Sequence, residues 1–229
     1  MATLIVALDL SSPSHALRLA QTLRSQVRWF KVGLELFTLA GPNFLKELKA
    51  LDAKIFLDLK FYDIPHTVER AIHSASALGV DLVTLHCQGG QRMLEAAVCA
   101  RKQLLALGQH PPLLYGVTVL TSMTAKDLPG ISQDPGDFAL QLALLASQSG
   151  LDGIVCSAHE VQNIKAQVPT LGCLCPGIRP SGTQSQDQRR IATPLAACQN
   201  GADWLVVGRP IVKSTDPLES ARQILSEMQ

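Results

Sequence analysis

Eight short apolar runs alternate with longer amphipathic stretches along this 229-residue chain, and this order limits the possible folds more than any other feature. Short apolar runs between turn residues predict strands that are buried on both faces of a parallel sheet. The expected strands are residues 4–9, 29–32, 54–59, 82–86, 113–119, 153–156, 171–174 and 204–207. The expected helices are residues 14–24, 42–50, 67–78, 91–107, 137–149, 159–167, 194–200 and 217–228.

Eight strand–helix units in a chain of this length predict an α/β fold, a single (β/α)8 TIM barrel that forms one catalytic domain over residues 1–229. An open, doubly wound sheet is the alternative. A Gly-x-Gly-x-x-Gly turn after the first strand would favour the open sheet, but the segment there is Asp9-Leu-Ser-Ser-Pro13. The long irregular segments 121–135 and 176–190 are expected to serve function, because compact domains seldom keep such loops otherwise.

Several helix starts carry local signals. Ser157 and Glu160 have the spacing of a capping box, and Thr193 and Asp216 each precede a proline at the first helical position. These residues predict where the last three helices begin.

The bulk composition excludes several classes of protein. The net charge is only +1, which gives no sign of a nucleic-acid or membrane partner but leaves a small anionic substrate possible. No apolar run reaches the length of a membrane span, and the first residues lack the basic segment of a signal peptide. The six cysteines are scattered, which indicates reduced thiols in a cytoplasmic protein. Cys173 and Cys175 could bridge or bind metal, but no second Cys/His pair has ligand spacing, so we expect no metal.

The segment Asp58-Leu-Lys60-Phe-Tyr-Asp63 is the strongest functional signal. It ends the third expected strand, where side chains alternate between faces, so Asp58 and Lys60 should point the same way. Asp63 should lie just beyond the strand, in a loop closed by Ile64-Pro65. Because grouping buried charges is costly, this cluster indicates catalysis or the binding of a charged ligand.

Polar residues also stand at the ends of the other expected strands. They are Asp9, Lys31, His86, Thr118, Thr121, Ser122, Ser157, Arg179 and Arg209. In a barrel these ends converge on one mouth, where barrel enzymes have their active sites. Taken alone, Lys31 could pair with Glu35, Asp9 could cap the first helix, and His86 could simply bond to backbone.

The last two strand ends favour phosphate binding. Gly208-Arg209 follows the eighth strand, and the polar loop 177–188 follows the seventh. Loops in these two places form the usual phosphate site of such barrels. Glycine lets a backbone N–H approach the phosphate oxygens, and arginine adds a bidentate donor. We therefore expect a phosphate site here, with the polar loop as its lid.

A set of motifs along nearly the whole chain resembles the orotidine 5′-phosphate decarboxylase family, specifically its bacterial branch. The motifs are Ala7-Leu-Asp9, Phe30-Lys31-Val-Gly33, the segment 58–67, the segment 117–123, Pro176-Gly-Ile-Arg179-Pro, Asp187-Gln188-Arg-Arg-Ile and Val207-Gly208-Arg209-Pro. The Asp-x-Lys-x-x-Asp core alone is shared with sister enzymes that act on sugar phosphates. Its combination with Thr-Ser-Met and the Pro-Gly-Ile-Arg loop is much more specific.

The resemblance implies a carboxy-lyase that needs no cofactor and no metal. Its substrate would be orotidine 5′-phosphate, converted to uridine 5′-phosphate and CO2 in de novo pyrimidine biosynthesis. It would work as a cytoplasmic homodimer, with Asp63 and Thr67 reaching across the interface into the partner's site. No nucleic acid or membrane would be involved.

The resemblance also implies a role for each site residue. Lys60 would stabilise a carbanion at C6 of the pyrimidine and then protonate it, while Asp58 would lie beside the departing carboxylate. Lys31 and Asp63 would complete an alternating row of charges. Asp9 and Lys31, together with the partner's Thr67, are expected to bind the ribose. Thr121 and Ser122 are expected to contact the pyrimidine. The residues expected at the lid and the phosphate are Arg179, Gln188, Gly208 and Arg209.

Three other functions remain open at this point. A sister sugar-phosphate decarboxylase or aldolase would use a divalent metal with the motif carboxylates. A Schiff-base aldolase would use Lys60 or Lys31 as its nucleophile, although neighbouring acids would keep such a lysine protonated. A barrel could also bind a nucleotide without any catalysis, since fold alone does not fix function.

Overall fold

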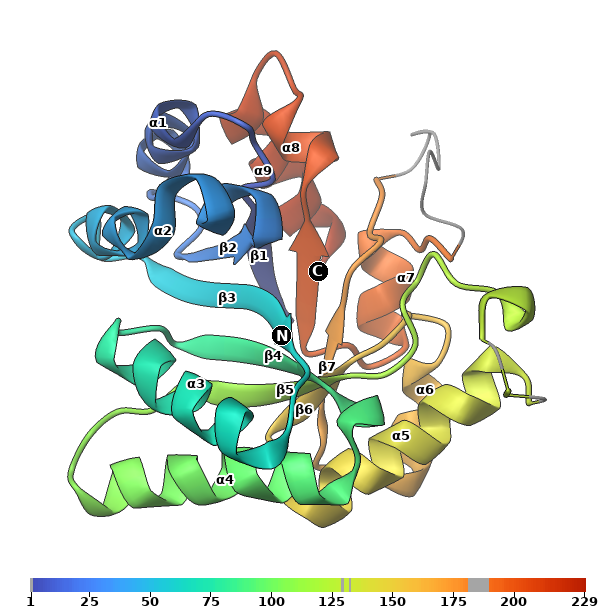
Figure 1. Cartoon of the computed structure of the whole chain (residues 1–229). Coiled ribbons are helices and arrows are strands. Elements are labelled where there is room, and N and C mark those ends of the chain that lie inside the picture. Colours follow the sequence, from blue (N-terminus) through green and yellow to red (C-terminus); the bar gives the residue numbers. More distant parts are fainter. Residues whose placement is uncertain (1, 129, 132, 181–189) are drawn as a thin grey trace.

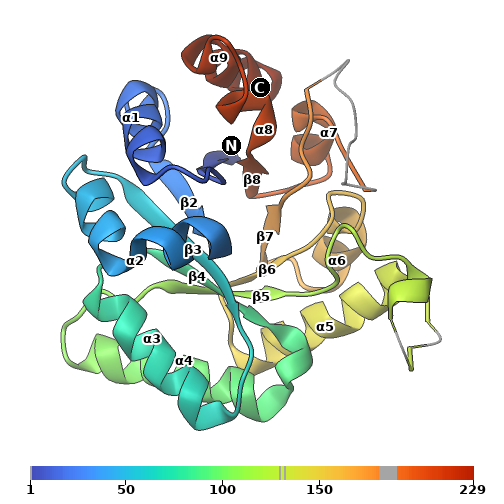
Figure 2. The same cartoon turned by 45° about the horizontal axis from the view of Figure 1, so that its top comes forward.

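The computed structural model describes residues 2–128, 130–131, 133–180 and 190–229, and its strands close into one parallel barrel. The strands follow one another around the barrel in sequence order, and helices surround them (Figures 1 and 2). The last strand pairs with the first, with Ile5 beside Val206, which completes the circle. The predicted (β/α)8 TIM barrel is therefore confirmed, and the open doubly wound sheet is the wrong alternative.

The strands lie within two residues of the predicted boundaries at each end. They are β1 (Thr3–Ala7), β2 (Trp29–Gly33), β3 (Lys54–Phe61), β4 (Leu82–His86), β5 (Leu113–Val117), β6 (Gly153–Val155), β7 (Gly172–Cys175) and β8 (Trp204–Val207). β1 stops two residues short of Asp9 because the chain turns at once, the N–H of Leu10 bonding to the carbonyl of Leu8 at 2.9 Å. β5 likewise ends at Val117 rather than at residue 119.

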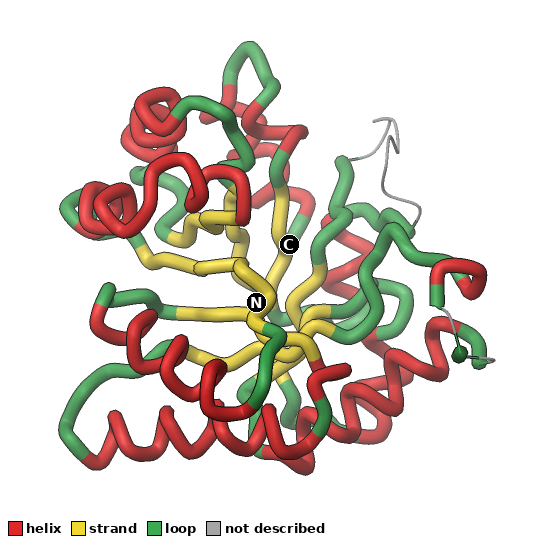
Figure 3. Tube along the Cα trace, viewed as in Figure 1, coloured by secondary structure: helices red, strands yellow, loops and turns green. Residues whose placement is uncertain are grey.

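Helices cover the outside of the strands (Figure 3). They are α1 (Pro13–Leu23), α2 (Leu34–Lys49), α3 (Pro65–Ala77), α4 (Gln91–Ala106), α5 (Pro135–Ser149), α6 (Val161–Gln167), α7 (Pro194–Gln199), α8 (Arg209–Val212) and α9 (Pro217–Glu227), with short 3-10 turns η1 (Cys87–Gly89) and η2 (Ala125–Asp127). In the described part of the chain, no helix has both the length and the apolar character needed to cross a membrane.

Two helices depart from the prediction. α2 begins at Leu34 rather than at Pro42, because the Gly41-Pro42 pair bends a longer helix instead of starting a new one. Gly41 has a φ of 62°, which glycine adopts without strain, and a second helical segment runs on from Pro42. α8 was not predicted, since a helix over Arg209–Val212 is too short to produce a hydrophobic period.

The predicted helix caps form at α7 and α9. Thr193 and Asp216 each accept a hydrogen bond from a backbone N–H of the first turn, at 3.2 and 3.0 Å. The capping box at Ser157 forms only in part: the Glu160 carboxylate accepts the N–H of Ser157 at 2.9 Å, but α6 begins only after Glu160. The predicted start at residue 159 is therefore two residues early.

Two layers of apolar side chains hold the barrel together. The larger lies between strands and helices, and the smaller fills the barrel interior. The inner layer consists of Ile5, Ala7, Phe56, Leu82, Tyr115, Leu174 and Val206. The side chain of Tyr115 fits because Gly153 and Gly172 leave space for it; a methyl group on Gly153 would lie 2.4 Å from its ring, and one on Gly172 would lie 2.4 Å from its hydroxyl oxygen. Its hydroxyl accepts a hydrogen bond from the indole of Trp204 at 2.8 Å.

Three aspartates form a repeated motif at the N-terminal rim of the barrel. Asp81, Asp152 and Asp203 precede β4, β6 and β8, and each follows by two residues a glycine with positive φ. Each carboxylate accepts a backbone N–H from the preceding strand, at 2.8, 2.8 and 2.7 Å, and pairs with basic side chains. The backbone donors are Ile55, Leu114 and Cys173, and the basic partners are Lys49 and Lys54, Arg101, and Lys165.

Candidate active site

A cavity of about 530 Å³ opens among the C-terminal ends of the strands. Four side chains of the inner apolar layer line it, namely Ala7, Phe56, Leu174 and Val206. Polar residues from the ends of β1, β2 and β3 lie on one side, and residues that follow β5, β7 and β8 lie on the other. The cavity is therefore where the sequence predicted the strand ends to converge.

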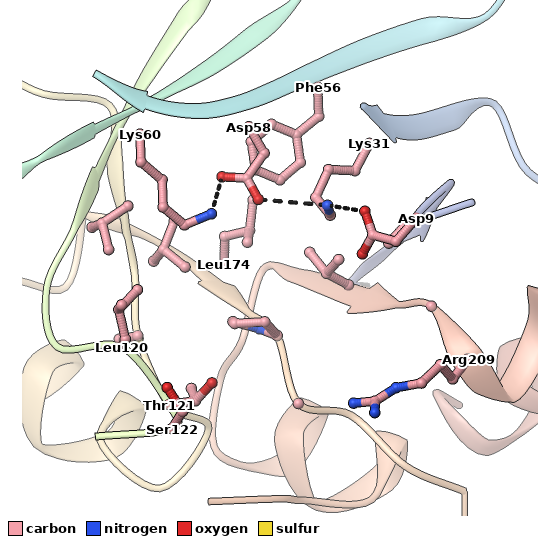
Figure 4. A pocket seen from close by; sticks show the side chains of 18 of the residues that line it. Asp9, Lys31, Phe56, Asp58, Lys60, Leu120, Thr121, Ser122, Leu174 and Arg209 are labelled. Atoms are coloured by element: carbon pink, nitrogen blue, oxygen red, sulfur yellow. Dashed lines mark hydrogen bonds and ion pairs between the residues drawn. The ribbon is translucent and has the colours of Figure 1, made fainter. Parts of the chain in front are cut away.

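One wall carries a row of alternating charges (Figure 4). The Lys31 Nζ lies 2.7 Å from Oδ1 of Asp9 and 3.6 Å from Oδ2 of Asp58. The Lys60 Nζ lies 2.8 Å from Oδ1 of Asp58. The result is a connected row, Asp9–Lys31–Asp58–Lys60, whose two central side chains are largely buried.

The row decides two alternatives that the sequence left open. Lys31 pairs with these two aspartates rather than with Glu35, within the residues that the structure describes. Asp9 joins the row instead of capping α1, whose N-cap residue is Ser12.

The Asp58 carboxyl is held ionised in spite of its burial. Burial raises its pKa, but the positive charges of Lys31 and Lys60, together with hydrogen bonds from Lys60 and Thr84, bring the pKa below its ordinary value. The Thr84 hydroxyl donates to Oδ1 at 2.9 Å. The ionised carboxylate in turn holds both ammonium groups at the cavity wall.

Lys60 reaches the row from an unusual backbone position. Its φ is 53°, in the left-handed region that non-glycine residues rarely adopt. The pairing of β3 with β4 shifts register between Leu57 and Phe61, as at a β-bulge. The N–H of Lys60 donates to the Thr84 hydroxyl at 3.0 Å, which fixes this turn of the backbone. Strand alternation predicted the correct face for Lys60, but a bulge aims the side chain, and such strain is common at functional sites.

Gly33, the last residue of β2, leaves room for the ammonium group of Lys31. A methyl group on Gly33 would lie 2.9 Å from Lys31 Nζ and 3.0 Å from Asp9 Oδ1. Any larger residue would therefore displace the Lys31–Asp9 end of the row.

His86 ends β4 beside the row but contributes no charge to it. Burial, followed by the positive charge of Lys60, lowers the pKa of the imidazole, and the negative charge of Asp58 offsets this only in part. The ring is therefore neutral at pH 7. It contacts the ring of Tyr62, with 5.6 Å between centroids.

The opposite wall carries hydroxyl and cationic groups. Thr121 and Ser122 follow β5, Arg179 follows β7, and Gly208-Arg209 follows β8; all of them line the cavity. Figure 4 shows Thr121, Ser122 and Arg209 across the cavity from the row of charges. The cavity thus combines an ion row on one side with two guanidinium groups on the other, which suits a substrate that carries two anionic groups.

Two predicted site residues do not line this cavity of their own chain, and a third lies outside the described residues. Asp63 and Thr67 are exposed, in the loop after β3 and in α3, and neither lines the cavity of its own chain. The Asp63 carboxylate accepts the N–H of Ile64 at 2.7 Å. Their role in a partner's site stays a prediction. Gln188, predicted for the phosphate site, lies outside the described residues.

Two residues of the site were missed in the sequence. Thr84 interrupts the apolar run of β4 and is fully buried. A buried hydroxyl in such a run indicates a hydrogen-bond partner inside the protein. Lys213 lines the cavity directly after α8, a helix that was itself not predicted, so no periodic pattern pointed to it.

Comparison with known proteins places this arrangement in one family. The model of the "Orotidine 5'-phosphate decarboxylase / HUMPS family" matches residues 2–224. The chain belongs to this family. The predicted resemblance to the decarboxylase family is thereby confirmed, and it extends over the whole barrel.

Relatives within the family are similar over their full length. The orotidine 5′-phosphate decarboxylase of Lawsonia intracellularis is 46% identical over 228 residues, covering 100% of both chains. That of Nitratidesulfovibrio vulgaris is 47% identical over 230 residues, covering 100% of this chain and 98% of the relative. The crystal structure of the Lactobacillus acidophilus enzyme superposes with a TM-score of 0.84 at 33% identity, covering 100% of both chains.

The described residues contain no ligand set for a metal centre. Among them, no group of three or more His, Cys, Asp or Glu side chains is placed so that it could hold a metal ion. All six cysteines are free thiols.

Proposed function

We propose that this chain is a carboxy-lyase that converts orotidine 5′-phosphate to uridine 5′-phosphate and CO2, a step of pyrimidine biosynthesis. Membership of the decarboxylase family and full-length relatives of that name support the assignment. The observation that carries it is the row Asp9–Lys31–Asp58–Lys60 on the wall of a cavity that also holds Arg179 and Arg209.

The row suits the chemistry of this reaction. When the bond between C6 and the carboxylate breaks, its electron pair stays on C6, and CO2 leaves. No adjacent carbonyl delocalises this charge well, so fixed charges must stabilise it. We assign that role to the ammonium group of Lys60, which then transfers its proton to C6. Asp58, 2.8 Å from Lys60, holds the ammonium charged and oriented.

Repulsion between Asp58 and the substrate carboxylate is a second contribution in this mechanism. The carboxylate of Asp58 is ionised and largely buried, so a second carboxylate beside it would be repelled until CO2 leaves. In this mechanism the scissile group would lie near the centre of the row.

The rest of the substrate then has a defined place. The ribose hydroxyls would bond to Asp9 and Lys31, and the pyrimidine edge to Thr121 and Ser122. The phosphate would lie at the remaining cationic side of the cavity, with Arg179, Gln188, Gly208 and Arg209 as its expected binding residues. Binding energy from the distant phosphate can then be used to strengthen interactions at C6 in the transition state.

We further propose a homodimer in which Asp63 and Thr67 complete the partner's site. Asp63 stands between two exposed apolar side chains, Tyr62 and Ile64, which are 60% and 66% accessible in the single chain. Such a patch beside a charged loop suits a two-fold interface, which would create two equivalent sites.

Mixing variants tests the shared site. Asp63→Asn and Lys60→Ala subunits should each be weakly active alone and should recover activity when mixed, because one site of the mixed dimer keeps both groups. No recovery, with subunit exchange verified by native mass spectrometry, would argue against sharing.

A cytoplasmic location is also part of the proposal. The free thiols support it, since buried and exposed cysteines remain reduced in that compartment.

An absorbance assay of the purified protein with orotidine 5′-phosphate, with and without EDTA, tests the proposed function. We expect rapid formation of uridine 5′-phosphate at the same rate in both samples. Turnover of a keto-sugar phosphate that EDTA abolishes would favour a sister enzyme. Borohydride trapping of a substrate adduct would favour a Schiff-base lysine, and tight binding of uridine 5′-phosphate without turnover would favour a non-catalytic binder.

A further inference from the structure

Arg190 joins three loops behind the wall of the cavity. It lies in the segment between β7 and α7 and is the first residue that the structure describes after residue 180. One guanidinium nitrogen pairs with the Glu160 carboxylate, in the segment after β6. Another donates to the backbone carbonyls of Val119 and Leu120, after β5, at 3.2 and 3.1 Å. Arg190 itself is not among the residues that line the cavity.

The backbone that follows Arg190 is anchored by two contacts. The N–H of Arg179 donates to the carbonyl of Ala192 at 2.9 Å, so the two ends of the β7 loop are paired. The His159 imidazole contacts the carbonyl of Ile191 at 2.9 Å. The guanidinium group therefore extends from a fixed base.

Its ion-pair partner is also fixed. Only 7% of the Glu160 side chain is accessible, and its second oxygen accepts the N–H of Ser157 at 2.9 Å. Arg190 thus has one immobile acceptor behind it, and its Nη2 donates to the β5 loop.

The two carbonyls that Arg190 binds directly precede Thr121 and Ser122. Val119 and Leu120 line the cavity themselves, and the next two residues are those expected to contact the pyrimidine. A shift of these carbonyls would move the hydroxyl groups of Thr121 and Ser122 relative to the row of charges on the opposite wall.

From these contacts we infer that Arg190 is a positioning residue for recognition of the pyrimidine. It acts through the carbonyls of Val119 and Leu120, and it ties the base-binding loop to the stem of the loop that carries Arg179. The inference rests on the proposed function, because it takes Thr121 and Ser122 as the pyrimidine contacts. Arginine suits the role, since one nitrogen of its planar fork pairs with the carboxylate while another, in a different position, donates to the two carbonyls; lysine has only a single nitrogen.

The variant Arg190→Lys separates positioning from charge. Lysine keeps a positive charge beside Glu160 but cannot keep all the carbonyl bonds. The matched control is Arg101→Lys in α4. Arg101 pairs with Asp152 at the N-terminal rim, and the two arginines are 19% and 20% accessible. Both changes should lower the unfolding temperature to a similar extent.

Calorimetric titration with two ligands provides the readout. Uridine 5′-phosphate contains the base, and ribose 5-phosphate lacks it. In Arg190→Lys we expect the affinity for uridine 5′-phosphate to fall about tenfold and that for ribose 5-phosphate less than about twofold. KM for orotidine 5′-phosphate should rise in parallel, and Arg101→Lys should change none of these values. Equal weakening of both ligands, or no change in either, would overturn the inference.

A second variant tests the same inference if Arg190→Lys folds poorly. The double variant Arg190→Met with Glu160→Gln removes the donors without leaving a buried charge unpaired. It should show the same difference between the two ligands, and the absence of that difference would also overturn the inference.

The activity of the wild-type protein separates a failure of the Arg190 inference from a failure of the proposed function. Turnover of orotidine 5′-phosphate by wild type, with no ligand difference in the variants, would refute the role of Arg190 alone. Absence of turnover by folded wild type would refute the proposed function, and the role of Arg190 in base recognition with it.

Discussion

The two ends of the barrel use the same kinds of charged side chain in different surroundings. At the N-terminal rim, Asp81, Asp152 and Asp203 each accept a backbone N–H from the neighbouring strand and pair with a lysine or arginine. At the C-terminal mouth, Asp58 is surrounded by the side chains of Lys60, Lys31 and Thr84, and its two cations line a cavity.

The difference lies in what each carboxylate holds in place. A rim carboxylate fixes backbone, so it ties one strand to the next and to a helix on the outside of the barrel. The Asp58 carboxylate fixes two ammonium groups that face open space. Ion pairs of similar length therefore stabilise the fold at one end and present charge to a ligand at the other. For such barrels this division is general, with chemistry at the C-terminal face and stability at the N-terminal face.

The largest effect on activity among the next four predictions is expected from Asp58→Asn. The amide cannot hold two ammonium groups, so kcat for orotidine 5′-phosphate should fall by about 10²-fold or more. The rim variant Asp152→Asn is the matched control and should keep kcat within about twofold, because it lies at the far end of the barrel. Similar losses of kcat in both variants would break the comparison.

A smaller effect on activity is expected from Gly33→Ala. The added methyl group would lie 2.9 Å from Lys31 Nζ, so the end of the lysine must shift by a few tenths of an ångström. Displacement of a positioned group on this scale should lower kcat/KM about tenfold. Urea unfolding should show little change, since the methyl group meets the tip of a flexible side chain. Unchanged kcat/KM would mean that the position of Lys31 is not critical.

At the rim, Asp81→Asn should affect stability rather than activity. Asp81 pairs with Lys49 and Lys54 and accepts a hydrogen bond from the N–H of Ile55. Its replacement should therefore lower the free energy of unfolding by about 2 kcal/mol. kcat/KM should stay within about twofold of wild type. Asp52→Asn is the control: Asp52 is exposed and paired with Arg28, and the change should cost less than about 0.5 kcal/mol.

The pH dependence of stability sharpens this prediction. Burial raises the pKa of Asp81, but hydrogen bonds from Lys54, Ile55 and Lys49 outweigh it, and the pKa lies below its ordinary value of 3.8. A carboxyl with a lowered folded-state pKa contributes its full stability above the unfolded-state value and loses it as the pH falls through the folded-state value. The difference in unfolding free energy between wild type and Asp81→Asn should therefore be constant from pH 7 to about pH 5 and shrink below about pH 4. A difference that does not begin to shrink as the pH falls below about 4 would contradict this explanation.

Much of the fold was predictable because each strand is a local apolar run. The repeated strand–helix order then left few topologies, and only closure of β8 on β1 required the structure. The errors occur where local signals are ambiguous. Gly41-Pro42 bends a helix instead of starting one, and α8 is too short to show the hydrophobic period of a helix. The rim motif recurs in the sequence as Gly79-Val-Asp81, Gly150-Leu-Asp152 and Gly201-Ala-Asp203, but the hydrogen bonds of its carboxylates to the preceding strands are seen only in the structure.

The site was predictable as a set of residues but not as an arrangement. Strand alternation put Asp58 and Lys60 on one side, yet the order Asp9–Lys31–Asp58–Lys60 depends on the register of three strands. Thr84 lies beside Asp58 because the preceding residues Leu57 and Val83 are paired, and it also accepts the Lys60 N–H at the bulge. Such cross-strand contacts are set by tertiary structure, which no local pattern encodes.

Turnover and unfolding of Lys60→Ala, measured on one preparation, most directly test whether the charges at the mouth serve catalysis. The variant removes the group assigned to C6 while Asp58 keeps Lys31 and Thr84 as partners. We expect kcat for orotidine 5′-phosphate to fall by at least about 10³-fold, with the free energy of unfolding within about 2 kcal/mol of wild type. Substantial turnover by a folded Lys60→Ala protein would contradict the assignment of Lys60, and with it the contrast between the two ends of the barrel.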